Sequence, residues 1–141
     1  MALFARWTFP YREVPAVDKL LSGRRVLVVE DEMLVLIMIE DMLADLGCMS
    51  VTSAATIDRA LALIHEQVFD VAMLDMNLNG NDSHVVAEAL VARDIPFFYS
   101  TGNSSRSLTD GYSDRPVLNK PFKFEELAAM LTRLKLAPIE R

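Results

Sequence analysis

The sequence predicts an α/β protein with a small doubly wound fold built on a parallel sheet. Its 141 residues are 52% hydrophobic and 24% charged, which is typical of one compact globular domain. From residue 24 onward, short apolar runs alternate with helical patterns of three- and four-residue spacing. Such alternation is typical of right-handed βαβ units, in which helices pack against a parallel sheet.

The first half of this pattern contains two strands and two helices. Residues 26–29 form a β-branched apolar run, which predicts a strand buried on both faces. A helix follows and ends at Gly47, and residues 48–52 predict a second, weaker strand before the next helix. The apolar stripes of the two helices are Leu36, Ile39, Leu43 and Leu46, then Ile57, Ala60, Leu61 and Ile64.

The second half adds three strands, at residues 71–74, 95–100 and 116–119. A turn is predicted at Asn79-Gly80, after the first of them. Residues 103–114 are rich in Ser, Gly, Asp and Asn, so we expect a loop or a short, mobile helix at the fourth crossover. The two other helices are marked by Val85, Val86, Ala89 and Leu90, and by Leu127, Leu131 and Leu134.

Residues 1–22 differ from the domain predicted over 23–141. Four aromatic residues interleave there with arginines and prolines, and no helical or strand period is visible. The segment is an extension that packs on the domain or frays, or else a docking or dimerisation segment, because exposed aromatic clusters are costly. The first helix carries apolar residues beyond its stripe, so we expect this segment or a second copy, as a homodimer, to cover them. These residues are Met33, Val35, Ile37 and Met38.

Several classes of protein are excluded or disfavoured by composition. The longest apolar run, residues 33–39, is far shorter than the roughly 20 residues of a membrane span. A net charge of −6 disfavours nucleic-acid binding. The single cysteine, Cys48, cannot form an intramolecular disulfide or anchor a structural zinc site. With no secretory signal at the start, we expect a cytoplasmic domain that contacts neither nucleic acid nor membrane.

Charged and hydroxyl side chains follow four of the predicted strands. Because the carboxyl ends of parallel strands meet at one edge of a sheet, these side chains converge there. Carboxylates in close proximity need a cation, and a set of oxygen ligands favours Mg²⁺. An aspartate beside such a metal can act as a nucleophile towards phosphorus, while a lysine and a hydroxyl contact phosphoryl oxygens. The residues are Glu30, Asp31, Asp75, Thr101 and Lys120, and they predict a phosphoryl-accepting site.

Four motifs at these strand ends together resemble the receiver domain of bacterial two-component signalling, over residues 23–138. They are Val-Leu-Val-Val-Glu-Asp-Glu (26–32), Ala-Met-Leu-Asp-Met-Asn-Leu (72–78), Ser-Thr-Gly (100–102) and Asn-Lys-Pro-Phe (119–122). The resemblance implies a flavodoxin-like, five-stranded parallel sheet of order 2-1-3-4-5 with helices on both faces. The segment 95–102 narrows the resemblance to stand-alone alphaproteobacterial receivers whose fourth strand reads Pro-Phe-x-Phe-x-Thr-Gly.

The resemblance also implies a role for each site residue. Asp75 corresponds to the phosphorylated aspartate, Thr101 to the switch hydroxyl and Lys120 to the lysine that contacts the phosphoryl group. A cis peptide is implied between Lys120 and Pro121. The implied Mg²⁺ ligands are Glu30 (through water), Asp31, Asp75 and the backbone carbonyl of Asn77.

These expectations describe a single-domain response regulator. It would receive a phosphoryl group on Asp75 from a sensor histidine kinase or a histidine phosphotransfer protein. It would then signal through protein contacts or act as a phosphorelay or phosphate sink. It would not be an enzyme, apart from assisting its own phosphorylation and dephosphorylation.

Three other functions compete with this one. A phosphate-independent, receiver-like interaction module stays open as the alternative. A flavin carrier is disfavoured because the acidic residues 30–32 would repel the cofactor's phosphate. An aspartyl-phosphate hydrolase is disfavoured because Asp75 is followed two residues later by Asn77, where that class has a second aspartate.

Three positions depart from the receiver pattern. Val117 replaces the usual aromatic residue, Asn79 replaces a common proline, and residues 103–114 specify the fourth helix poorly. Together they weaken the expectation that helix four, strand five and helix five form the output face. We instead expect phosphorylation to order residues 103–114, an order–disorder switch of known type.

Overall fold

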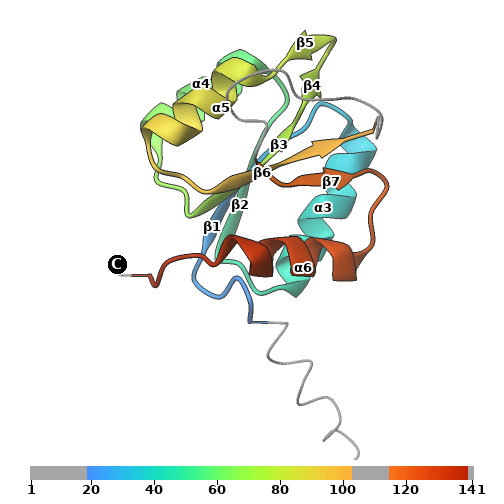
Figure 1. Ribbon diagram of the computed structural model, residues 1–141, viewed down its shortest axis with the longest axis vertical. Helices are drawn as coiled ribbons and strands as arrows, with labels where there is room; N and C mark the ends of the chain where they lie inside the picture. The colour runs from blue at the N-terminus through green and yellow to red at the C-terminus, as the bar shows by residue number, and fades with distance from the viewer. Residues whose placement is uncertain (1–18, 103–114, 140–141) are drawn as a thin grey trace, which may run out of the picture.

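The computed structural model describes residues 19–102 and 115–139 and contains a five-stranded parallel sheet (Figure 1). The strand order is β2-β1-β3-β6-β7. Counted along this sheet alone, that order is the predicted 2-1-3-4-5, and the flavodoxin-like fold is confirmed. The strands are β1 (Arg25–Val29), β2 (Ser50–Ala54), β3 (Val71–Asp75), β6 (Phe97–Thr101) and β7 (Val117–Asn119).

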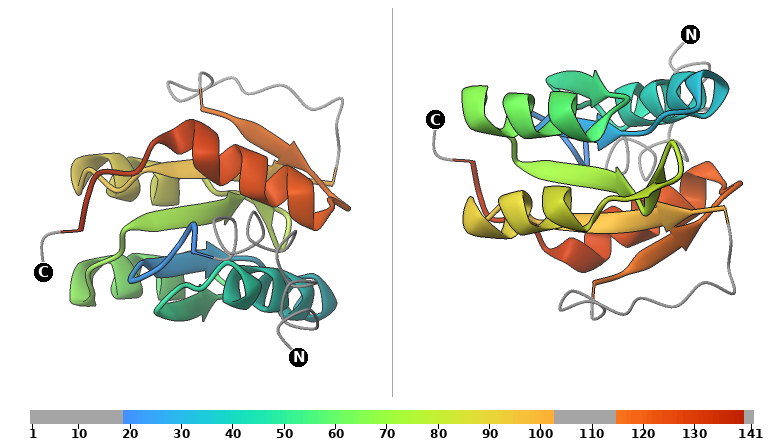
Figure 2. Two further views of the ribbon diagram at one scale, coloured as in Figure 1. Left: turned by 90° about the horizontal axis from the view of Figure 1, so that it is seen from below. Right: turned by 90° about the horizontal axis from the view of Figure 1, so that it is seen from above.

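Helices cover both faces of the sheet (Figures 1 and 2). Helices α4 (Ile57–Glu66) and α5 (His84–Ala92) pack on one face, and α3 (Met33–Asp45) and α6 (Phe124–Leu134) pack on the other. The α4 helix begins at Thr56, whose side chain accepts a hydrogen bond from the Arg59 N–H at 3.1 Å. All four predicted helices are present, and their apolar stripes face the sheet except at Val85, which is 42% exposed while Ala87 is buried instead.

Strand β1 explains why the sheet strands have continuous apolar sequences. Leu27 and Val29 belong to the core beneath α4 and α5, whereas Val26 and Val28 belong to the core beneath α3 and α6. Alternate side chains point to opposite faces of a strand, so a strand covered on both sides needs apolar residues throughout. The same alternation holds in β3 and β6, and it builds two cores on one sheet.

Two details of the chain differ from the prediction. Strand β2 begins at Ser50, two residues later than expected, because Cys48 forms an isolated antiparallel bridge with Ser22 instead. A second, small sheet is added by β4 (Asn77–Leu78) and β5 (Asn81–Asp82). The predicted turn joins these strands, and positive φ angles at Asn79 (54°) and Gly80 (85°) are typical of a two-residue hairpin turn.

The first described residues pack against the core of the domain. Leu21 is fully buried, and its N–H donates to the carbonyl oxygen of Leu46 at 3.0 Å. The division of the chain at residue 22 stays a prediction, as does the ordering of residues 103–114, because residues 1–18 and 103–114 lie outside the described part. No helix within the described residues is long and apolar enough to cross a membrane.

Candidate phosphoryl-acceptor pocket at the strand ends

A hollow of about 420 Å³ lies at the carboxyl ends of the central strands. Here the chain leaves β1, β3, β6 and β7, and each strand delivers its last residues to the same edge. Glu30 lies buried beside this hollow, so the structure brings every predicted site residue together. The hollow is lined by Asp31, Glu32, Asp75, Asn77, Thr101, Gly102 and Lys120.

Three carboxylates form the acidic part of this pocket. Glu30, Asp31 and Asp75 each offer an oxygen, and these oxygens lie within 4.8 Å of one another. Glu30 and Asp75 are only 2% and 4% exposed, because Glu30 directly follows the buried strand β1 and Asp75 is the last residue of the buried strand β3. Burial raises the pKa of Glu30 to about 7, and the negative charge of Asp75 adds to this effect. Holding all of this negative charge in the pocket is therefore unfavourable.

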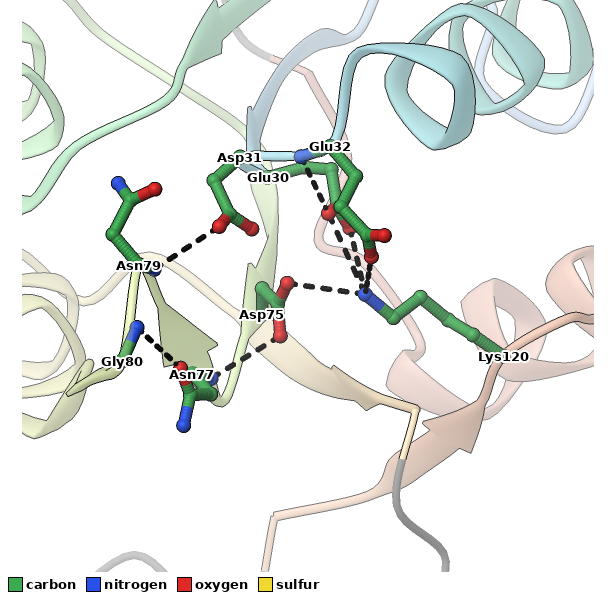
Figure 3. Close-up of polar contacts among 8 residues, drawn as sticks. All are labelled: Glu30, Asp31, Glu32, Asp75, Asn77, Asn79, Gly80 and Lys120. Carbon is green, nitrogen blue, oxygen red and sulfur yellow. Dashed lines mark hydrogen bonds and ion pairs between the residues drawn. The ribbon is translucent and has the colours of Figure 1, made fainter.

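Lys120 supplies the positive charge of the pocket (Figure 3). Its Nζ lies 3.1 Å from Asp75 Oδ2, 3.2 Å from Glu30 Oε1 and 3.4 Å from Glu32 Oε1. Burial disfavours the charged ammonium group, but the hydrogen bonds and charges of Asp75 and Glu30 outweigh it, so the pKa of Lys120 is raised. The lysine is thus held as a cation between carboxylates.

The backbone after β7 places this lysine. The Lys120 N–H donates to the Thr101 carbonyl oxygen at 2.7 Å, which ties the lysine to the end of β6. The peptide bond between Lys120 and Pro121 is cis, as the resemblance implied. Thr101 is 5% exposed and lines the same hollow.

Both oxygens of the Asp75 carboxylate have a fixed partner (Figure 3). Oδ2 accepts from Lys120 Nζ, and Oδ1 accepts from the Asn77 N–H at 3.1 Å. The Asn77 side chain in turn accepts the Gly80 N–H at 2.8 Å, which closes the loop after β3. Asp75 is therefore oriented into the hollow by the lysine and by its own loop.

The β4–β5 hairpin also contacts the acidic cluster, which the sequence did not reveal. The Asn79 N–H donates to Asp31 Oδ2 at 3.0 Å, and its side chain donates to the Ala55 carbonyl oxygen at 3.2 Å. The positive φ of Asn79 explains why this chain lacks the common proline, since proline fixes φ near −65° and has no N–H. The Asn-Gly dipeptide was the one signal that pointed to this geometry.

A second unpredicted contact involves Glu32. It is the N-terminal cap residue of α3, and its side chain is 65% exposed while it reaches Lys120. Its N–H donates to Glu30 Oε2 at 3.1 Å, so the start of α3 is bonded to the buried carboxylate. Changes in the pocket thus have a direct connection to this helix.

The donor set fits a magnesium ion. The ligand atoms that Glu30, Asp31 and Asp75 offer are carboxylate oxygens, which hard divalent cations prefer. Three carboxylates share this pocket with a single lysine, so Lys120 alone does not neutralise the cluster. The acidic cluster of Glu30, Asp31 and Asp75 therefore matches a receiver Mg²⁺ site in its chemistry.

Comparison with known proteins agrees with the geometry. A family model described as the response regulator receiver domain matches residues 26–132. The chain therefore belongs to the receiver domains of two-component signalling, which are signalling modules rather than enzymes. No curated protein matches the chain.

Solved structures place the chain more closely within this family. The solution structure of SdrG from Sphingomonas melonis Fr1 is 41% identical, with a TM-score of 0.68 over 82% of this chain and 98% of that chain. The BeF3-activated conformation of SdrG from Pseudomonas melonis Fr1 is 43% identical, with a TM-score of 0.70 over 80% and 97%. These matches confirm the predicted resemblance to single-domain alphaproteobacterial receivers.

A third structure bears on the metal. The receiver domain of the sensor histidine kinase PA1611 from Pseudomonas aeruginosa PAO1 is 28% identical, with a TM-score of 0.66 over 80% of this chain and 98% of that chain. That crystal structure has a magnesium ion coordinated in its active-site cleft.

Proposed function

We propose that this protein is a single-domain response regulator whose Asp75 accepts a phosphoryl group from a phosphohistidine. The observation that carries the proposal is the setting of the Asp75 carboxylate. It is oriented by Lys120 and the Asn77 N–H, lies beside Glu30 and Asp31, and faces an open hollow. A histidine kinase or a histidine phosphotransfer protein is the donor that receiver domains imply.

The proposed transfer needs one nucleophile and two supporting groups. An oxygen of Asp75 attacks phosphorus, the phosphorus–nitrogen bond breaks, and the released imidazole keeps the electron pair and takes up a proton. Lys120 neutralises charge on one phosphoryl oxygen, and the Thr101 hydroxyl donates a hydrogen bond to another. Both groups already line the hollow next to Asp75.

A magnesium ion completes this site in the proposal. Glu30, Asp31, Asp75 and the carbonyl of Asn77 would hold it, with Glu30 acting through water. When bound, it neutralises charge shared by the aspartate and the phosphoryl oxygens. The three carboxylate ligands, which share the pocket with only one lysine, support this assignment.

Phosphorylation changes the partners of Lys120 in this scheme. The new group carries a charge of about −1.5 to −2 and competes with the two remaining carboxylates, Glu30 and Glu32, for the same ammonium group. The Glu32 side chain is 65% exposed whereas that of Glu30 is buried, so the Glu32 contact is the weaker of the two. Release of Glu32 from Lys120 would change the surface at the start of α3, and a partner protein that binds there would detect the phosphorylated state.

Intact-protein mass measurement tests the proposal. The full chain is incubated with Mg²⁺ and acetyl phosphate, alongside Asp75→Asn and the exposed control Asp58→Asn on α4. We expect wild type and Asp58→Asn to gain one phosphoryl group, Asp75→Asn to gain none, and EDTA to abolish the gain. No gain from acetyl phosphate or from a histidine kinase would overturn the proposal in favour of a phosphate-independent interaction module.

A further inference from the structure

One face of α3 is apolar at one end and acidic at the other. Met33, Leu34 and Ile37 are 67%, 82% and 47% exposed, and they lie at the start of the helix. Asp41 and Asp45 continue the same side of the helix at four-residue spacing, and both are exposed. Clustered large apolar side chains on a surface mark an interaction site. We call these five residues the α3 face.

The chain that precedes the described residues joins the domain at the acidic end of this face. The Leu21 N–H donates to the carbonyl oxygen of Leu46, the residue that caps the C-terminal end of α3. The 13 residues of α3 extend about 20 Å. Residues 4–11 span about 26 Å when extended, so they can follow the full length of the helix from an Arg12 held near its acidic end.

The composition of that segment complements the α3 face. Arg12 lies seven residues before the described chain, with the acidic residues Glu13 and Asp18 in between, and it can pair with Asp41 or Asp45. The aromatic residues lie further towards the N-terminus of the chain and can cover the apolar start of α3. They are Tyr11, Phe9, Trp7 and Phe4, with Arg6 among them.

We propose that residues 4–12 dock antiparallel on the α3 face of their own chain. Arg12 pairs with the acidic half, and the aromatic side chains cover Met33, Leu34 and Ile37. A short tether gives a linked segment an effective concentration of about 1 mM or more, so even a weak contact closes within one chain. At micromolar protein, a second copy offers the same segment at a far lower concentration.

The docked segment lies beside the carboxylate pocket. Met33 directly follows Glu32, whose side chain reaches Lys120 in the hollow. A phosphodonor protein that contacts this end of α3 would compete with the segment, whereas a small donor such as acetyl phosphate would not. This consequence rests on the proposed function, but the docking itself does not.

Fluorescence of the full-length protein tests the docking, because Trp7 is its only tryptophan. We expect blue-shifted emission and weak acrylamide quenching in wild type, at all protein concentrations. Leu34→Asp should weaken docking about tenfold or more, shift the emission to the red and increase quenching. The control Val68→Asp, at an apolar position that is 63% exposed between α4 and β3, should behave as wild type.

Two results would overturn the proposal. One is fully exposed Trp7 emission in wild type that Leu34→Asp leaves unchanged. The other is protection of Trp7 that disappears on dilution, which assigns the α3 face to a second copy. Acetyl phosphate labelling of the same samples separates the two claims, since failure of labelling counts against Asp75 as acceptor and not against docking.

Discussion

The body of each central strand and its carboxyl end differ sharply in composition, although both are buried. In β3, Leu74 is fully buried among apolar side chains, and the next residue, Asp75, is a carboxylate that is 4% exposed. Burying the leucine contributes to stability, whereas burying the carboxylate costs free energy that its contacts with Lys120 and Asn77 have to offset. The strands thus provide the stability that lets the sheet edge hold an unfavourable cluster of charge.

The raised pKa of Glu30 is the clearest sign of this cost. One lysine faces Glu30, Glu32 and Asp75, and Asp31 adds a further charge nearby. A pocket with surplus negative charge favours whatever brings positive charge or takes up a proton. The strand ends are therefore built for ligand and phosphoryl chemistry, and the strand bodies for stability.

Adjacent substitutions in β3 should separate these two roles most strongly. We expect Leu74→Ala to lower the free energy of unfolding by about 2–5 kcal/mol through lost burial and a cavity. Asp75→Asn should change it by less than about 1 kcal/mol, because the amide oxygen keeps the Asn77 hydrogen bond and one repelling charge is removed. Urea denaturation measures both. A larger loss for Asp75→Asn than for Leu74→Ala would reverse the comparison.

The stability of the metal-free protein should depend on pH through Glu30. Its pKa rises from 4.5 to about 7 on folding, so the folded state binds this proton more tightly. The resulting stability is complete below pH 4.5 and is lost as pH rises through about 7. The loss amounts to at most about 3 kcal/mol.

The variant Glu30→Gln provides the control for this pH effect. Urea denaturation at pH values on both sides of 7 measures the free energy of unfolding. This free energy should fall less with rising pH in the variant than in wild type. Equal pH dependence of the two proteins would show that Glu30 does not titrate as the pocket geometry requires.

Magnesium binding should show the opposite pH trend to metal-free stability. Below the Glu30 pKa of about 7, a proton must leave before the carboxylate can help to hold the ion. We expect the Mg²⁺ affinity to fall by up to about tenfold for each pH unit below that value. Isothermal titration in two buffers of different ionisation enthalpy measures the released proton, and its absence would contradict the assignment.

The hairpin beside the pocket should give the smallest effect. Gly80 has a φ of +85° and open space where a Cβ would stand, so Gly80→Ala adds only backbone strain, worth about 1–2 kcal/mol. In Asn79→Gly, the glycine tolerates the positive φ of position 79 and keeps the backbone N–H that donates to Asp31. Thermal unfolding should show a loss of stability for Gly80→Ala. Mg²⁺ titration should show little change in affinity for Asn79→Gly.

Much of this architecture follows from the sequence, for reasons that differ by region. Apolar runs such as residues 26–29 predict buried strands, and the motifs that follow them bring Asp31, Asp75 and Lys120 to one edge. The predicted limits of β2 differ from the observed ones because Ser50, Thr52 and Ser53 give this strand a weak apolar pattern.

Other contacts depend on geometry that no local pattern specifies. The bond from Asn79 to Asp31 requires a hairpin whose strands have only two residues each. The contact between Glu32 and Lys120 depends on the reach of two long side chains across 88 residues of sequence. Such contacts arise from the tertiary placement of the strand ends, so sequence spacing alone cannot reveal them.

The most direct test of the account is to locate the phosphoryl group chemically. After incubation with Mg²⁺ and acetyl phosphate, sodium borohydride reduces an acyl phosphate of aspartate to homoserine, and peptide mass spectrometry identifies the position. We predict conversion of Asp75 alone, and none when EDTA is present. Conversion at Asp31 or another carboxylate instead, with Asp75 intact, would contradict the central claim that the strand-end pocket exists to present Asp75 to phosphorus.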